Sequence, residues 1–374
     1  MKFYFRKNFN ISKNLNKRLV ISSSIVGIIA VIYTIFWHSM AVYLENSIDD
    51  WRSYKTDQGV ESSYSMIEVG GFPLNFNIRI NNPRLQAPLA AIGTGEINKI
   101  KKWIWEGNHL IVKLRPWNFN IITFDLSGSN RFLLRGKNVI YDFASKTKLI
   151  NIDSKMSQGA WPKKIMIRLE GMQLSEKISK SDISIKSALF STQIVLNEDT
   201  RDSVTKKNLN RVLQVRLEDL YLPKKLRWPP DSHVKKLSMK LNIFENLDLI
   251  LNKKNLKKWR DAGGIIDINL FEAVFGELKT HATGTLALDQ DLQPLLAMTA
   301  NFEGIVPLID KLTVLGHIRT NTAMIAKIIF GGLAERLGNE RSSIGLPLTI
   351  QNRNLSVGPI SVFTLPFINW GNGR

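Results

Sequence analysis

The feature that most constrains this chain is a long uncharged run near its N-terminus. From Leu19 to Leu44 no side chain carries a charge, and most residues are apolar. About 20 apolar residues span the hydrocarbon core of a bilayer as a helix. Tyr33, Trp37 and Tyr43 stand where aromatic side chains meet lipid headgroups. We therefore predict a transmembrane helix over these residues, which makes the lipid bilayer the first expected partner.

The charges on either side of this run predict its orientation. Glu45, Asp49 and Asp50 follow it, and no acidic residue precedes it. The preceding cations are Lys2, Arg6, Lys7, Lys13, Lys17 and Arg18. Because basic residues beside a membrane helix stay on the cytoplasmic side, residues 1–18 are predicted to form a cytoplasmic basic tail. Everything after about residue 45 is then expected to lie on the other side of the membrane, outside the cytoplasm.

A cleaved signal peptide is the competing interpretation of the same run. Ser39-Met40-Ala41 has the small-x-small pattern of a cleavage site. The run is longer than the roughly 7–15 apolar residues of a signal-peptide core, which favours an uncleaved anchor over residues 19–44. Beyond it, Leu44, Ile48 and Trp51 form one stripe and predict a membrane-proximal helix over 45–60.

Period-two alternation dominates the chain after residue 60. Leu74, Phe76, Ile78 and Ile80 alternate with polar residues, as strands with one buried face do. Further segments of this kind are 110–114, 119–126, 139–143, 165–169, 183–190, 211–217, 237–243, 264–271, 279–288, 296–303, 312–318, 346–351 and 354–365. We predict a mainly β fold with a minor α+β character. The N-terminal helix is followed by an elongated, curved or two-part antiparallel β-sheet with a few helices.

Helical spacing and turn residues subdivide the exported part. A helix is predicted at 322–337 and a second at 247–259, before Gly263-Gly264. The polar segment 197–210 is predicted to be a loop, and prolines interrupt 222–230. We therefore divide the chain into β-rich regions at 61–225 and 226–374, with a soft boundary near 220–235.

The net charge of +19 raises the question of nucleic-acid binding. A nucleic-acid footprint clusters its cations on one face or motif, whereas lysines are spread along this chain, so no nucleic-acid partner is expected. The short basic-aromatic segments 224–228 and 257–260 are interpreted as Lys and Arg stems around a half-buried Trp, with base stacking or headgroup contact as the alternative. The chain contains no cysteine, which excludes disulfides and thiolate metal sites.

No catalytic constellation is apparent. The histidines are isolated at positions 38, 109, 233, 281 and 317, and none has metal-ligand spacing. Asp289 and Asp291 flank a turn-like segment, and Gly93-Thr94-Gly95 is also best interpreted as a turn. We therefore predict no catalytic residues, no cofactor-binding residues and no metal site, and expect a protein that is not an enzyme. An exported hydrolase with paired acids stays open as an unfavoured alternative.

Several short motifs occur in a fixed order along the chain. They are Gly70-Gly71-Phe72-Pro73-Leu74-Asn75-Phe76, Arg115-Pro116-Trp117-Asn118, Gly263-Gly264, Gly284-Thr285-Leu286-Ala287-Leu288-Asp289, Leu292-Gln293-Pro294, Gly345-Leu346-Pro347-Leu348-Thr349-Ile350-Gln351 and Leu355-Ser356-Val357-Gly358-Pro359. As an ordered set ending at Leu365-Pro366-Phe367, they resemble an alphaproteobacterial family, domain-of-unknown-function family 2125. The residues 259–262 before Gly263 depart from that pattern, which leaves the local turn open.

The resemblance implies an inner-membrane-anchored, periplasm-facing protein and brings no activity with it. The closing pattern is also similar to that of large envelope proteins whose groove-shaped sheets help outer-membrane assembly and lipid movement, an analogy of fold alone. The leading hypothesis is therefore lipid or apolar-cargo handling in envelope assembly. The alternative is an envelope scaffold that binds another protein. An open apolar groove would favour the first, and a filled core with an exposed apolar patch the second.

Overall fold

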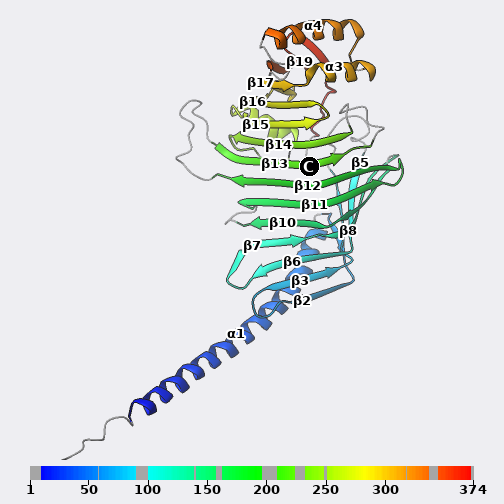
Figure 1. The fold of residues 1–374 in the computed structure, drawn as a ribbon. Helices are drawn as coiled ribbons and strands as arrows, with labels where there is room; N and C mark the ends of the chain where they lie inside the picture. The colour runs from blue at the N-terminus through cyan, green and yellow to red at the C-terminus, as the bar shows by residue number, and fades with distance from the viewer. Residues whose placement is uncertain are drawn as a thin grey trace, which may run out of the picture.

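The structure, a computed structural model, describes residues 10–57, 59–89, 100–138, 140–156, 162–195, 209–223, 232–247, 251–316, 318–336 and 344–371. A single long helix, α1 (Asn10–Thr56), leads into a large antiparallel sheet (Figure 1). This combination confirms the predicted mainly β fold with an N-terminal apolar helix. The predicted segment 45–60 belongs to the same unbroken α1, which ends at Thr56 and not at residue 60.

Twenty strands belong to the sheet in the part of the chain that the structure describes. They are β1 (Glu61–Ser63), β2 (Met66–Gly70), β3 (Phe76–Asn81), β4 (Arg84–Pro88), β5 (Ile100–Gly107), β6 (His109–Arg115), β7 (Asn118–Asp125), β8 (Gly128–Gly136), β9 (Ile140–Thr147), β10 (Leu149–Lys155), β11 (Lys164–Glu176), β12 (Ser181–Ile194), β13 (Leu209–Tyr221), β14 (His233–Phe244), β15 (Ile266–Phe275), β16 (Leu278–Leu288), β17 (Pro294–Glu303), β18 (Ile344–Gln351), β19 (Asn354–Val357) and β20 (Ile360–Thr364). From β11 to β18 each strand pairs with the next, so this half is a simple meander.

The sheet divides into two arms at β11. The first half of this strand, Lys164–Glu170, pairs with β10, and its last residues, Gln173–Glu176, pair with β9. Between them Gly171 has φ +58, a conformation that glycine adopts without strain and that bends the strand. One arm continues as β10-β7-β6-β3-β2 and the other as β9-β8-β5-β4-β1. Strands β5 and β8 run across the direction of the stacked strands (Figure 1).

Helix α1 closes the end of the sheet where the two arms finish. It contacts β1 and β2, the last strand of each arm. Trp37 and Ala41 of the helix are buried against Phe76, Ile78 and other apolar residues of the sheet. Covering such strands with a helix protects their unpaired backbone groups and removes apolar surface from water. The N-terminal part of α1 stands free of the sheet (Figure 1).

The opposite end of the sheet is covered by α3 (Ile305–Val314) and α4 (Thr320–Arg336), while α2 (Lys253–Asp261) lies between β14 and β15 in the chain. Ala323 and Ala326 of α4 are buried in one cluster with Ala282 and Ala300 of the sheet. Small side chains on both sides let the helix approach the strands closely. The predicted helix at 322–337 is confirmed as α4.

Three further predicted elements were wrong in their bounds or type. Residues 312–318 were expected to be a strand, but Leu312 lies in α3, where it is buried with Ile305 and Ile309 at helical spacing. The segment 354–365 forms the two strands β19 and β20, because Gly358 reverses the chain with φ +57. The helix expected at 247–259 begins at Lys253, after the Asn252 side chain, which accepts a hydrogen bond from the Asn255 amide at 2.8 Å.

Candidate functional site

One face of the sheet carries an unbroken row of apolar side chains. Each residue of the row is paired directly with the next across neighbouring strands, in the order β2-β3-β6-β7-β10 and then β11 to β18. The row is Val69, Ile78, Val112, Phe124, Ile152, Ile167, Phe190, Val215, Met239, Phe271, Ala282, Ala300 and Leu346. At about 4.8 Å per strand it extends for roughly 55 Å. We call these residues the apolar row.

The rows on either side of it are also largely apolar. Leu169, Ala188, Leu217 and Leu237 are paired in sequence next to the middle of the apolar row. On its other side Leu213 is paired with Leu241. The apolar row is therefore the centre of a broad apolar face.

Burial along the apolar row falls from the ends to the middle. Ile78 is buried beneath α1, and Ala282, Ala300 and Leu346 are buried beneath α3 and α4. Every member from Val112 to Phe271 is only partly buried. No apolar residue of β9 to β13 belongs to the buried core of the described chain. The middle of this face is therefore open, and no element among the described residues covers it.

The other face of the same strands is polar. In β13, Gln214 and Arg216 alternate with Val215 and are exposed. In β14, Lys240 follows Met239 and is likewise exposed. Because successive side chains of a strand point to opposite faces, the alternation read from the sequence gives the sheet one wetted and one apolar surface.

One cation lies at the margin of the apolar face. Arg211 is paired with Ile194 and Ile243, and it is the one buried Lys or Arg among the described residues. Its Nη1 donates to the Thr192 hydroxyl at 3.4 Å, while its buried Nε has no acceptor in the structure. Burial lowers the pKa of the guanidinium. A guanidinium with free donors beside apolar side chains is suited to an anionic oxygen.

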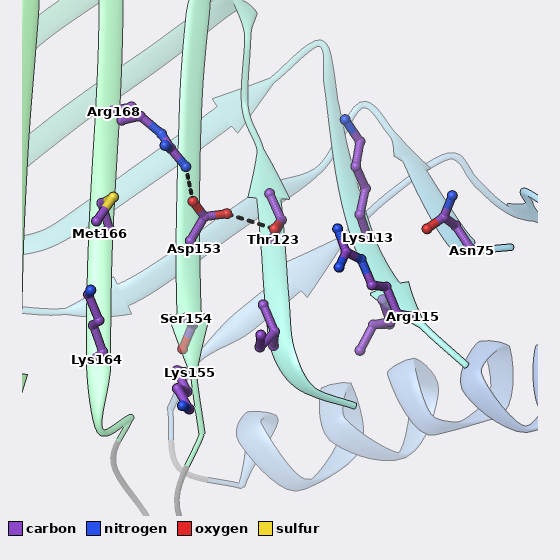
Figure 2. A pocket seen from close by; sticks show the side chains of 12 residues that line it. Asn75, Lys113, Arg115, Thr123, Asp153, Ser154, Lys155, Lys164, Met166 and Arg168 are labelled. Atoms are coloured by element: carbon purple, nitrogen blue, oxygen red, sulfur yellow. Dashed lines mark hydrogen bonds and ion pairs between the residues drawn. The ribbon is translucent and has the colours of Figure 1, made fainter. Parts of the chain in front are cut away.

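A basic depression lies on the polar face near the end of the sheet that α1 contacts (Figure 2). Its volume is about 530 Å³. The cations that line it are Lys113, Arg115, Lys155, Lys164 and Arg168, and Asp153 is the one carboxylate in its lining. Apart from Asn75, which precedes β3, the lining residues come from β6, β7, β10 and β11, whose ends lie side by side there. We call this feature the basic depression.

The cations of the basic depression differ in their partners. Arg168 pairs with Asp153, which also accepts a hydrogen bond from the Thr123 hydroxyl at 2.7 Å. Lys113 pairs with Asp125 at 3.3 Å. Arg115, Lys155 and Lys164 have no carboxylate partner in the described part of the chain. These three charges are available to anions in solution or on a membrane surface.

The junction of β9, β11 and β12 is held by a network of charged side chains. Arg131 donates from Nε and Nη2 to the two carboxylate oxygens of Asp142 at 2.9 and 2.7 Å, which lowers the pKa of Asp142. The backbone amide of Asp142 donates to Glu176 at 3.2 Å, and the amides of Ile178 and Ser179 donate to the same carboxylate. Hydrogen bonds from Ser179 are the main cause that lowers the pKa of Glu176 to about 2. These bonds connect the end of β11 to β9 and to the turn that leads into β12.

The histidines singled out in the sequence do not come together. His233 lies 3.0 Å from Asp219 and stacks on Tyr221, with ring centroids 4.2 Å apart. His281 lies 3.8 Å from Glu272, and His38 stacks on Phe72. His109 is the first residue of β6, and His317 lies outside the described residues.

The other segments weighed in the sequence have local roles where they are described. Asp289 accepts hydrogen bonds from the amides of Asp291 and Gln293, each at 2.8 Å, as expected of a turn residue. Trp259 is buried, and its indole donates to the Phe244 carbonyl at 2.7 Å. Arg260 donates to the carbonyls of Asp289 and Gln290. The segments 224–228 and 93–95 lie outside the described residues.

Side chains of the described residues form no group of three or more His, Asp or Glu that could hold a metal ion. The apolar row and the basic depression were not identified from the sequence. Alternation within each strand was visible, but the apolar row depends on which residue pairs with which. Residue pairing is set by strand order and register, which the sequence does not state.

The structure defines a β-sheet protein with one exposed apolar face and one N-terminal helix long and apolar enough to cross a membrane. Residues 37–366 match the family model described as an uncharacterised protein conserved in bacteria. The chain therefore belongs to domain-of-unknown-function family 2125, as the ordered motifs predicted. No curated protein matches it. The match begins at Trp37, the first residue of α1 that the sheet buries.

Proposed function

We propose that this is a single-pass inner-membrane protein that handles lipids or other apolar cargo, without catalysing a reaction. In this proposal α1 spans the membrane with its N-terminus in the cytoplasm, and the sheet lies in the periplasm. The observation that carries it is the apolar row, which is continuous over thirteen strands and open in its middle. The basic tail and the acidic residues that follow the helix support the orientation.

An open apolar face of this length is suited to acyl chains. Each square ångström of apolar surface removed from water contributes about 25 cal/mol. An acyl chain that covers the partly buried apolar row would therefore be held there by the surface that both remove from water. The apolar row begins at the strands that α1 covers and leads away from the membrane-spanning part of the chain (Figure 1). A lipid that leaves the bilayer next to α1 would meet apolar side chains at every strand along its way.

Arg211 supports a phospholipid over a neutral lipid. A buried cation without a carboxylate partner is costly unless an anion is present. A phosphodiester oxygen would accept hydrogen bonds from the guanidinium while the acyl chains lie on the neighbouring apolar side chains. Substituting Arg211→Met is expected to lower the ratio of phospholipid to neutral lipid that the protein retains. Arg211→Lys, which keeps the positive charge, should lower this ratio less.

The decisive experiment compares two substitutions on β13 that point to opposite faces. The full chain is purified in a lipid-free detergent after expression, and its bound lipids are extracted and measured by mass spectrometry. Val215→Glu places a charge in the apolar row and is expected to reduce bound lipid several-fold. Gln214→Glu adds the same charge on the exposed polar face and should leave bound lipid unchanged. Equal lipid in the two variants, or none in the unmodified chain, would overturn the proposal.

Folding of the variants is checked separately. Phe190→Asn tests the neighbouring position of the apolar row without adding a charge. Circular dichroism and thermal unfolding should show native-like strand content for all three variants. A variant that has lost its strands is excluded, and the remaining apolar-row variant still decides the question.

An envelope scaffold is the second candidate function, and one observation favours it. Met324, Ile325 and Ile328 of α4 are exposed at the end of the sheet far from α1. A cluster of exposed apolar residues on one helix is typical of a protein-interaction surface. If Val215→Glu leaves bound lipid unchanged and Ile328→Asp abolishes an interaction with another envelope protein, the scaffold becomes the better proposal.

A further inference from the structure

The point at which α1 leaves the sheet is held by the turn between β2 and β3. The Trp37 ring lies 5.4 Å from the Phe72 ring, and the Tyr33 ring lies 6.4 Å from it. The Tyr33 hydroxyl donates to the Pro73 carbonyl, and the Trp37 indole donates to the Asn75 carbonyl at 3.3 Å. Ring contacts and hydrogen bonds to backbone carbonyls therefore fix this turn, residues 71–75, to the helix near positions 33–38.

The length of the free helix places this turn close to the bilayer. From Leu19 to Ile32 the helix is free of the sheet, and these 14 residues are about 21 Å long. The hydrocarbon core of a bilayer is about 30 Å thick and requires about 20 residues. Residues 33–38 are thus needed to complete the span. The 71–75 turn contacts these residues. It must then lie in the interfacial layer of the leaflet that residues 33–38 enter.

A second turn lies beside the first. Phe76 at the start of β3 is paired with Leu114 near the end of β6, so the 71–75 turn and the turn between β6 and β7 are neighbours. Both turns lie on the side of the sheet from which the free part of α1 emerges (Figure 1). Their tips carry large apolar side chains that are exposed, Leu74 at 60% and Trp117 at 64%, together with Phe72.

We propose that these two turns dock into the headgroup layer of the bilayer that α1 spans. Phe72, Leu74 and Trp117 enter the interface, and Arg115 next to Trp117 contacts lipid phosphates. Aromatic rings favour this depth of a membrane, and cations without carboxylate partners are attracted to anionic lipids. Contact at two turns in addition to α1 holds the sheet at one orientation, with the covered end of the apolar row at the membrane surface. The inference rests on α1 spanning a bilayer and does not require lipid handling.

The natural absence of cysteine makes the test direct, because each introduced cysteine is the single labelling site. Leu74→Cys and Trp117→Cys are made one at a time in the full chain, labelled with an environment-sensitive fluorophore, and reconstituted in vesicles of phosphatidylcholine and phosphatidylglycerol. Quenching by lipids that carry a nitroxide close to the headgroup is then measured. The expected result is several-fold stronger quenching at positions 74 and 117 than at a control in water.

Three control positions make the result decisive. Val314→Cys reports the water-exposed far end of the molecule, where Val314 is 87% exposed on α3. Met66→Cys lies on β2 itself, four residues or about 13 Å from the end next to the turn. Ile28→Cys lies on the free part of α1 and reports insertion of the helix.

The outcomes separate this inference from the anchor itself. Strong quenching at 28, 74 and 117 with weak quenching at 66 and 314 supports docking of the two turns. Strong quenching at 28 alone overturns the docking while the anchor stands. Weak quenching at all five positions overturns both. If position 66 is quenched as strongly as 74, the whole edge of the sheet lies on the membrane and the two-turn contact is wrong.

Discussion

The two ends of the sheet are closed by different means. At the end next to α1, large aromatic rings fill the contact, and Trp37 stacks on Phe76 with ring centroids 5.1 Å apart. At the far end the contact between α4 and the sheet is made by small residues such as Ala300 and Ala326, both almost completely buried. The first closure depends on interdigitated rings, and the second depends on close approach of backbones.

Between the two ends the same face has no cover. The difference shows that the apolar row and the core are not the same set of residues. Within the apolar row, the buried residues lie toward the two ends, and each end has its own helical cover. The central strands are stabilised mainly by their hydrogen-bonded neighbours and by contacts between side chains on one face. Substitutions at the ends and in the middle should therefore differ in size and in kind.

The largest effect is expected from Trp37→Ala at the aromatic end. Trp37 is 3% exposed, and its loss removes ring contacts and the hydrogen bond to Asn75. Truncating a buried Trp typically costs about 3–5 kcal/mol of unfolding free energy. Chemical denaturation of the full chain in detergent measures it. Trp51→Ala on the same helix, where Trp51 is 45% exposed, is the matched control and should cost much less. Equal losses would show that α1 is not a cover for this end.

The next effect concerns the end of β11, where a carboxylate accepts hydrogen bonds from the backbone. Glu176→Gln removes a carboxylate that accepts three backbone amides, and bonds to charged groups contribute about 1.5–3 kcal/mol. The pKa of Glu176 is lowered from its ordinary value of 4.5 to about 2. Its contribution is therefore complete above about pH 4.5 and is lost as the pH falls toward 2.

A pH series of unfolding experiments checks this prediction. The stability difference between the natural chain and Glu176→Gln should be constant from neutral pH to about 5 and shrink steadily at lower pH. Asp182→Asn is the matched control, since Asp182 is an exposed carboxylate on the neighbouring strand β12. A difference that stays constant to pH 2 would contradict the role of the Glu176 carboxylate.

A third prediction tests the close approach at the far end. Ala300 is completely buried between the sheet and the helices, so Ala300→Leu forces the cover away from the strands. Overpacking of this kind costs about 1–3 kcal/mol. Ala297→Leu on the same strand points to the exposed face and should change stability little. Thermal unfolding distinguishes the two. If they are equivalent, small residues are not what the far end requires.

The sequence allowed the long apolar N-terminal helix, the β-rich fold and α4 to be predicted, because the signal for each lies within a single helix or strand. Val215 alternates with Gln214 and Arg216, which predicts two faces for one strand. The residue pattern gave a wrong prediction where a short segment fits strand alternation and helical spacing equally well. Leu312 to Val314 alternate like a strand but belong to α3, whose burial at 305, 309 and 312 became clear only from its packing.

The candidate site could be predicted only in its parts. That Phe190 is apolar is plain from the sequence, but that it pairs with Ile167 on one side and Val215 on the other is a property of register. The same holds for Arg211, whose burial depends on the strands beside it. The basic depression unites cations from the three strands β6, β10 and β11, and spacing along the chain does not reveal that proximity. Chemistry that depends on pairing across strands requires the structure.

The smallest effect is expected on the polar face, and it completes the comparison. Lys236 pairs with Glu272 at 2.7 Å across β14 and β15, with both side chains in contact with solvent. Exposed ion pairs contribute only about 0–1 kcal/mol, because solvent screens them and ordering the side chains costs entropy. Lys236→Ala should therefore barely change the unfolding free energy, while the pKa of Glu272, which Lys236 lowers, should rise toward its ordinary value when followed by NMR titration. A loss larger than about 2 kcal/mol would mean that the wetted face stabilises the middle of the sheet. In that case interactions on the polar face would hold the middle of the sheet together. The exposure of the apolar face would then be as much a consequence of that stabilisation as a feature suited to a ligand.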